Sequence, residues 1–265
     1  MESVFRLGYV PGATPGKWAR IWRERLPQVR LDLVQIDAAD AVAALERGDV
    51  DAALARLPVD KTRLHAIALY DELAVVVFSR DHLLAATGDD ETVTPDDIDD
   101  DAVFLPLDDV LYSSVPGVKR ADGATVPPGR AVAQEHRPQA TADAIAVAAS
   151  GAGVTVVPMS LARLHHRKDV RYRVLAGGPP SSMGLVWVPE RASDLNEEMV
   201  GIVRGRTANS TRGTLNNPAS AESSGGERGG GAKKQAGSGG HGKGRGKAAK
   251  PKSKAVANRT RRRPR

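Results

Sequence analysis

The sequence of 265 residues contains no cysteine, so it forms no disulfide and offers neither a thiolate nucleophile nor a thiolate metal site. Aromatic residues are scarce, at 4% of the chain, and the last of them is Trp187. No apolar run approaches the roughly 18 residues of a membrane-spanning helix. The first residues, MESVFRLGYV, lack the pattern of a secretory signal. These absences predict a soluble, cytoplasmic protein with no membrane partner.

Negative charge is missing from one part of the chain. The last 38 residues, from Arg228, hold 14 of the 38 Lys and Arg but none of the 32 Asp and Glu. Residues 1–227 therefore hold 24 basic and 32 acidic residues, a net charge of −8 against +14 for the tail. The overall charge of +6 hides an acidic body joined to a basic tail.

The basic tail is also poor in apolar residues, so burial cannot offset the entropy of its chain. We expect residues 207–265 to be disordered and rich in Gly, Ser, Lys and Arg. Its charges can contact phosphates of DNA or RNA without reading sequence. The residues expected to do so are Lys243, Arg245, Lys247, Arg261, Arg262 and Arg263. The alternatives are an extension without a partner and intrachain pairing with the acidic segment 89–101.

The sequence of residues 1–206 predicts a folded body of mixed α/β structure. Between residues 5 and 55, strand-like and helix-like segments alternate as β-α-β-α-β, which is typical of a parallel sheet covered by helices. Thr14 is expected to cap the first helix, with Pro15 at its first position. Further along, AVVVF within 66–79 reads as a buried strand. An Ala-rich helix is expected over 141–150, with Thr141 as its cap, and a last helix over 194–204.

Four stretches, in this order and spacing, resemble the effector-binding (substrate-binding) domain of LysR-type transcriptional regulators. They are LGYVPGATPGKWARIWRERLPQVRLDLV, LERGDVDAALARLP, LYDELAVVVFSRDHLLA and AVAASGAGVTVVPMSLARL. The resemblance covers residues 5 to about 204. It implies a fold like type 2 periplasmic binding proteins: two Rossmann-like lobes joined by two crossover strands, with a ligand cleft between them.

Carried onto this chain, the resemblance places lobe I at about 1–77 and 182–206, and lobe II at about 78–181. Regulators of this family begin with a winged helix-turn-helix that reads DNA. Here Met1 lies four residues before the first strand of the effector domain, so we expect that reading head to be absent. The resemblance also implies a small-molecule effector, a homodimer and a role in transcription regulation.

The first strand-to-helix turn, Pro11, Gly12, Ala13 and Thr14, is a candidate ligand site because ligands bind at the carboxyl ends of parallel strands. The resemblance points to the same turn and to Ala38. Amides at helix starts favour an anionic ligand. Arg56, at a strand end, is suited to holding a carboxylate, with a salt bridge to Asp60 or a solvated position as alternatives. Gln139 and Thr141 are candidates from the other lobe.

Other polar clusters indicate no chemistry. His165 and His166 are adjacent and so do not share a helix face; a basic helix end explains them better. The acidic cluster within 96–101 lacks the pattern of a calcium loop. There is no dinucleotide fingerprint, P-loop or G-x-S-x-G elbow. We therefore expect no metal, no cofactor and no catalysis.

Two functions are compatible with this sequence. The first is a sensing domain for a small, anionic metabolite, a carboxylate, which works in transcription regulation. The second is a nucleoid-associated or non-specific nucleic-acid-binding protein that uses its basic tail.

Overall fold

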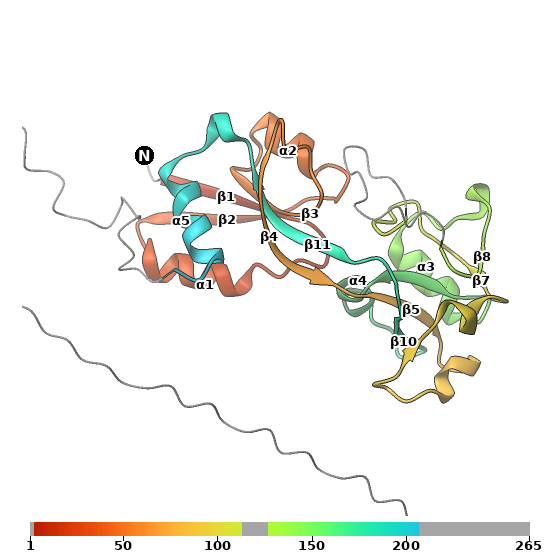
Figure 1. The fold of residues 1–265 in the computed structure, drawn as a ribbon. Coiled ribbons are helices and arrows are strands. Elements are labelled where there is room, and N and C mark those ends of the chain that lie inside the picture. The colour runs from red at the N-terminus through yellow and green to blue at the C-terminus, as the bar shows by residue number, and fades with distance from the viewer. Residues whose placement is uncertain (1–2, 113–126, 207–265) are drawn as a thin grey trace, which may run out of the picture. The chain divides into compact units, whose positions relative to one another are not determined.

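The computed structural model describes residues 3–112 and 127–206, which belong to one compact unit with an α/β fold (Figure 1). The predicted fold class is confirmed. The strands are β1 (Ser3–Tyr9), β2 (Val29–Gln35), β3 (Ala52–Arg56), β4 (His65–Glu72), β5 (Ala74–Ser79), β6 (Thr92–Val93), β7 (Ala102–Val103), β8 (Arg130–Ala131), β9 (Thr155–Pro158), β10 (Val170–Leu175) and β11 (Ser181–Trp187). The helices are α1 (Gly16–Arg25), α2 (Ala41–Arg47), α3 (Thr141–Ala149), α4 (Met159–Leu164) and α5 (Asp194–Val203), and short 3-10 turns span Leu83–Ala86, Pro95–Ile98, Gln134–His136 and Pro189–Arg191.

The first sheet, which we call lobe I with its helices α1, α2 and α5, has the order β2-β1-β3-β11-β4. Strand β1 is parallel with both β2 and β3, as β-α-β units require, whereas β11 is antiparallel to β3 and β4. The central strand β3 is buried along its whole length. Trp22 of α1 stacks on Phe5 at 4.8 Å and donates its indole N–H to the Val29 carbonyl, so α1 is fixed against the sheet.

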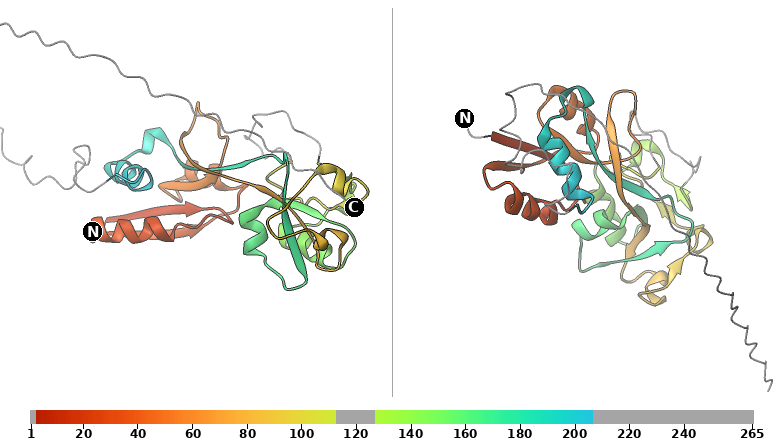
Figure 2. Two further views of the ribbon diagram at one scale, coloured as in Figure 1. Left: turned by 60° about the horizontal axis from the view of Figure 1, so that its bottom comes forward. Right: turned by 60° about the vertical axis from the view of Figure 1, so that its left-hand side comes forward.

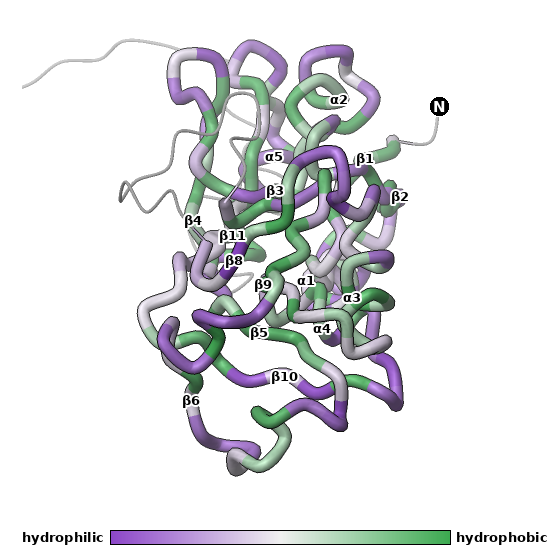
Figure 3. Tube along the Cα trace, turned by 90° about the vertical axis from the view of Figure 1, so that its right-hand side faces the viewer, coloured by the Kyte–Doolittle hydropathy of each residue, from purple (hydrophilic) through white to green (hydrophobic). Residues whose placement is uncertain are grey.

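The second sheet, which we call lobe II with β7, β8, α3 and α4, has the order β6-β10-β5-β9. Strand β5 lies inside it and is buried at all six positions. Its side chains alternate between two cores: Val76 and Phe78 pack into one, Val75 and Val77 into the other. A strand covered on both faces must be apolar throughout, and Figure 3 shows β5 and β9 as mostly hydrophobic.

Two strands of the first sheet lead to and from lobe II. The chain leaves β4 and enters β5 after Leu73, and it returns from β10 to β11 through residues 176–180. Strands β4 and β11 pair over their full length, and they run side by side between the lobes in Figures 1 and 2. The change of sheet at Leu73 comes a few residues before the expected boundary near 77. Lobes I and II are thus joined by one antiparallel strand pair.

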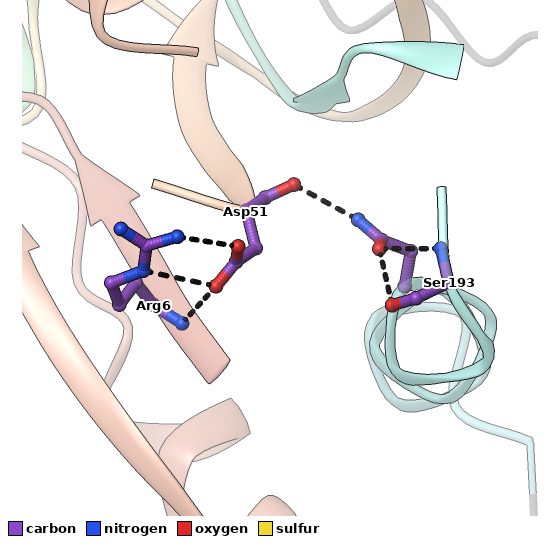
Figure 4. Close-up of polar contacts among 4 residues, drawn as sticks. Arg6, Asp51 and Ser193 are labelled. Carbon is purple, nitrogen blue, oxygen red and sulfur yellow. Dashed lines mark hydrogen bonds and ion pairs between the residues drawn. The ribbon is translucent and has the colours of Figure 1, made fainter. Parts of the chain in front are cut away.

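Helix α5, which follows β11 in lobe I, is tied to the start of β3 (Figure 4). The buried Asn196 donates its amide to the Asp51 carbonyl at 2.9 Å and accepts the backbone N–H and the hydroxyl of Ser193. The Asp51 carboxylate in turn accepts three hydrogen bonds from the backbone and guanidinium of Arg6. These contacts join β1, β3 and α5 at one point.

Local details differ from the sequence expectations at the helix starts. The N-cap of α1 is Pro15, so the prediction that Thr14 caps this helix is wrong. Thr141 is the first residue of α3 and not its cap, because Ala140 holds the extended cap conformation. The expected disordered tail, including its nucleic-acid candidates, lies outside the described residues.

Candidate effector cleft between the two lobes

A cavity of about 550 Å³ lies between the lobes, next to the strand pair that joins them. It is large enough for a small organic molecule. Lobe I contributes Pro11, Gln35, residues 37–40 and Arg56 to its lining; lobe II contributes residues 107–110 and 139–142, Leu161 and His165.

The cavity brings together five of the eight ligand residues proposed from sequence. Pro11, Ala38 and Arg56 line it from lobe I, and Gln139 and Thr141 from lobe II. The other three do not line it. Ala13 is buried in the core of lobe I, Thr14 is exposed to solvent, and Gly12 faces α4. Ligand contact by any of the eight stays a prediction.

Gly12 makes the close approach between the first turn and lobe II possible. Its φ is +90°, a backbone conformation that residues with a side chain rarely adopt. A Cβ at this position would lie 2.3 Å from Ser160 Oγ and 3.2 Å from Arg56 Nη2. Glycine is thus required here for contact between the lobes.

Arg56 is engaged inside the protein. Its Nη1 donates to Glu72 Oε2 at 3.0 Å and to Ser181 Oγ at 2.5 Å, and its Nη2 donates to the Pro11 carbonyl at 3.3 Å. The side chains of Arg56 and Glu72 are each only 8% exposed. The alternative partner Asp60 is wrong, because Asp60 instead accepts the backbone N–H and hydroxyl of Thr62.

The Arg56–Glu72 pair lies where the lobes meet. Glu72 ends β4 and Ser181 begins β11, so both flank the crossings between sheets. Glu72 Oε2 also accepts the hydroxyl of Ser160 from α4 at 2.8 Å. Burial raises the pKa of Tyr70 above its usual value, and the negative charge of Glu72 raises it further, so this phenol stays neutral. This cluster connects lobe I to lobe II through side chains as well as backbone.

Carboxylates dominate the remaining charge of the cavity. Asp37 and Asp40 approach from lobe I, and Asp108 and Asp109 from lobe II. Asp109 is buried and accepts the backbone N–H groups of Leu111 and Tyr112. Asp108 accepts the Thr141 hydroxyl at 2.9 Å. His165 completes the set of charged or titratable groups in the lining.

Sequence reasoning missed these aspartates and His165 as cavity residues. Asp37 and Asp40 flank Ala38 just after the carboxyl end of β2, where ligands of parallel sheets bind, so this general rule is a signal that could have found them. His165 follows the last residue of α4, and its place in the cavity depends on how α4 packs against β5 and β9. No local pattern in the sequence reveals that packing.

Within residues 3–112 and 127–206, no group of three or more acidic or histidine side chains is arranged to hold a metal ion. In the same part of the chain, no helix is both long and apolar enough to cross a membrane.

The two lobes, the paired strands between them and the cleft beside those strands define the class of effector domains with a type 2 periplasmic-binding-protein-like fold. A family model described as the LysR substrate binding domain matches residues 3–208. The chain belongs to this family, as predicted. The matched region contains no helix-turn-helix.

The curated relatives are transcriptional regulators. The chain is 25% identical over 217 residues to the Hca operon transcriptional activator HcaR of Escherichia coli (strain K12), covering 79% of this chain and 70% of that protein. It is 33% identical over 88 residues to a probable hydrogen peroxide-inducible genes activator of Mycobacterium xenopi, covering 32% of this chain and 47% of that protein. These relatives place the family's effector-binding role in transcription regulation.

Solved structures share the fold. The oxidized form of OxyR matches with a TM-score of 0.59 and 21% identity, covering 78% of this chain and 96% of that one. The effector-binding domain of BenM with its effector benzoate matches with a TM-score of 0.60 and 17% identity, covering 77% and 92%. At these identities the likeness shows the fold alone.

Proposed function

We propose that this protein senses a small molecule in the cavity between its lobes and passes the signal on through the angle between them. The observation that carries the proposal is the lining: residues from both lobes enclose one cavity beside a single pair of connecting strands. A ligand that contacts both walls binds the closed arrangement better than an open one and shifts the population toward it. The change in angle would alter a contact between subunits of a homodimer, with an effect on transcription.

Spin labels on the two lobes test this proposal. Because the chain has no cysteine, Lys17→Cys in lobe I and Lys168→Cys in lobe II create two unique labelling sites on exposed positions. A library of organic acids, amines and neutral metabolites is first screened for compounds that raise Tm. A stabilising compound should narrow or shift the distance distribution between the labels. A stabilising compound that leaves the distribution unchanged would contradict closure.

The charge of the effector is the finer question. The sequence predicts a carboxylate, and the BenM domain, which shares the fold, was solved with benzoate. The cationic group on which that prediction depends, Arg56, is paired with Glu72. The other charged side chains of the lining are mostly carboxylates, which favour a ligand of the opposite charge.

The basic tail supports a second candidate, non-specific nucleic-acid binding. Its 14 positive charges without one acid would release counterions from a phosphate backbone. Comparing DNA binding by residues 1–207 with binding by the full chain separates the two functions, because effector sensing needs only the body.

A further inference from the structure

We infer that the effector carries a cationic group, an ammonium or guanidinium on an apolar skeleton. The inference rests on the proposed function and concerns the same cavity. Two features of the cavity could attract an anion, Arg56 and the helix starts, and both lie beside carboxylates of the protein. The exposed aspartates of the lining have no ion-pair partner among the described residues and could attract a cation.

The first such feature is Arg56, the only Lys or Arg in the described lining of the cavity. Its charge is matched by Glu72 at 3.0 Å, and the two side chains are equally buried. A ligand carboxylate would have to compete with Glu72 for the guanidinium. It would also lie close to the Glu72 carboxylate in a partly desolvated site, which is unfavourable.

The helix starts that face the cavity are the second feature. Asp37 and Asp40 precede α2 and line the cavity themselves. At the start of α3, Asp143 accepts the backbone N–H of Ala140, and Asp108 accepts the Thr141 hydroxyl. A ligand anion at either start would therefore lie beside carboxylates of the protein, whose repulsion opposes the favourable partial charge of the helix start.

What remains exposed in the cavity is negative. Asp37, Asp40 and Asp108 are exposed, and in the described part of the chain no ion pair neutralises any of them. They approach from both lobes, so a cation between them would draw the lobes together. Unpaired carboxylates in a concave site also focus a negative potential, which raises the local concentration of cations.

Apolar side chains complete the chemistry of the site. Leu107, Val110 and Leu161 line the cavity from lobe II, and Ala38 and Ala142 lie in the lining of lobes I and II respectively. A bare inorganic cation would leave this apolar surface exposed to water. An alkyl or aromatic amine would bury it while its charged end met the aspartates.

Matched probes of opposite charge test the inference on the full chain. Benzylamine, benzamide and benzoate share a ring, and 1,4-diaminobutane and succinate share a four-carbon chain. We expect the amines to raise Tm more than their carboxylate or neutral counterparts. A ligand at ten times its Kd should shift Tm by about 3–6 °C for a body of this size.

Variants with asparagine in place of a cavity aspartate show whether the amines bind in the cavity. Asp37→Asn, Asp40→Asn and Asp108→Asn each keep side-chain volume and an accepting oxygen but remove a charge. Each replaced carboxylate that contacts the ammonium should weaken amine binding about fivefold to tenfold. The matched control is Asp99→Asn with Asp100→Asn, two exposed acids that do not line the cavity, and it should leave the Kd unchanged.

The outcomes are distinguishable. An equal loss of amine binding in the control and the cavity variants would reveal general attraction to an acidic surface and overturn the inference. Stabilisation by benzoate or succinate but not by the amines would overturn it too, while leaving the proposed function intact. If no probe raises Tm, and if no compound of the wider library changes the distance between the spin labels, the proposed function itself is overturned.

Discussion

Arg56 and Glu72 are the most deeply buried ion pair among the described residues, with each side chain 8% exposed. Removing two charges from water is costly, and their mutual attraction offsets that cost only with good geometry and further hydrogen bonds. Here Ser181, Pro11 and Ser160 supply those bonds. Such a pair adds little net stability as a unit. Removing one partner leaves the other charge buried and unpaired.

Glu72→Gln should therefore destabilise the protein strongly. The variant keeps the size of the side chain and an oxygen for Ser160, but Arg56 loses its counter-charge. We expect the free energy of unfolding to fall by about 3 kcal/mol and Tm to fall by about 6–12 °C. Urea denaturation and calorimetry measure both quantities.

Glu24→Gln is the matched control, since Glu24 pairs with Arg20 on α1 with both side chains more than half exposed. Its cost should stay below about 0.5 kcal/mol. Replacing both buried partners, Arg56→Met with Glu72→Leu, should recover most of the stability lost in Glu72→Gln. Equal small losses in Glu24→Gln and Glu72→Gln would show that burial does not govern the Arg56–Glu72 pair.

At the scale of elements, α5 depends on one buried side chain for its place in lobe I. Asn196 is 3% exposed and links the Asp51 carbonyl to the N-cap residue Ser193 (Figure 4). The apolar residues Met199, Val200 and Ile202 pack into the lobe I core, but such packing is not directional. The hydrogen bonds of Asn196 are directional, so we expect them to set the position of α5 along the sheet.

Asn196→Ala should loosen α5 selectively. It leaves the Asp51 carbonyl and the Ser193 N–H without partners, at a cost of about 2 kcal/mol. Hydrogen exchange should quicken in the amides of α5 and remain unchanged in β5, which belongs to the other lobe. Glu197→Ala, an exposed change on the same helix, is the control. Equal acceleration in β5 would mean that the lobes unfold together and contradict local loosening.

Most elements of this fold could be predicted from sequence because periodicity is local. The apolar run AVVVF, the αL glycine Gly48 and the face of α1 formed by Trp18 and Trp22 need no tertiary information. The cap of α1 and the partner of Arg56 do need it. Ser160 and Ser181, which fix the environment of Arg56, lie 104 and 125 residues away from it in the chain. Pairing over such distances leaves no local pattern.

The sequence predicted where the candidate site lies but not which charged residues line it. Pro11, proposed from the switch-point rule, Ala38, proposed from the family resemblance, and Arg56, proposed from its place at a strand end, all line the cavity. The aspartates of that wall were not predicted, because the preference of helix starts for anions was considered without the carboxylates of the protein that lie beside those starts. Asp40 lines the cavity before α2, and at the start of α3 Asp108 accepts the Thr141 hydroxyl and Asp143 accepts the Ala140 N–H. The sign of a site depends on the pairing of its charges, which only the folded structure displays.

At the scale of the whole molecule, charge divides the protein into two parts with opposite behaviour toward nucleic acid. Residues 1–227 carry a net charge of −8 and residues 228–265 carry +14. A polyphosphate should be repelled by the first and attracted by the second. Any affinity for DNA shown by this chain should therefore come from the tail, with strong salt dependence and without sequence choice.

Changing Lys243, Arg245, Lys247, Arg261, Arg262 and Arg263 together to Gln keeps the length of the tail and removes six of its charges. Fluorescence anisotropy with a scrambled 20-base-pair duplex should then show weaker binding at every salt concentration. The slope of log K against log salt should fall in magnitude by up to about 5, since each neutralised phosphate contributes about 0.9. Tm should not change, because these positions follow the family domain, which ends near residue 208.

If the variant binds the duplex with the parent's affinity and slope, the tail is not the nucleic-acid-binding element. If the parent instead prefers one promoter fragment over the scrambled duplex, the charge argument alone does not explain its binding.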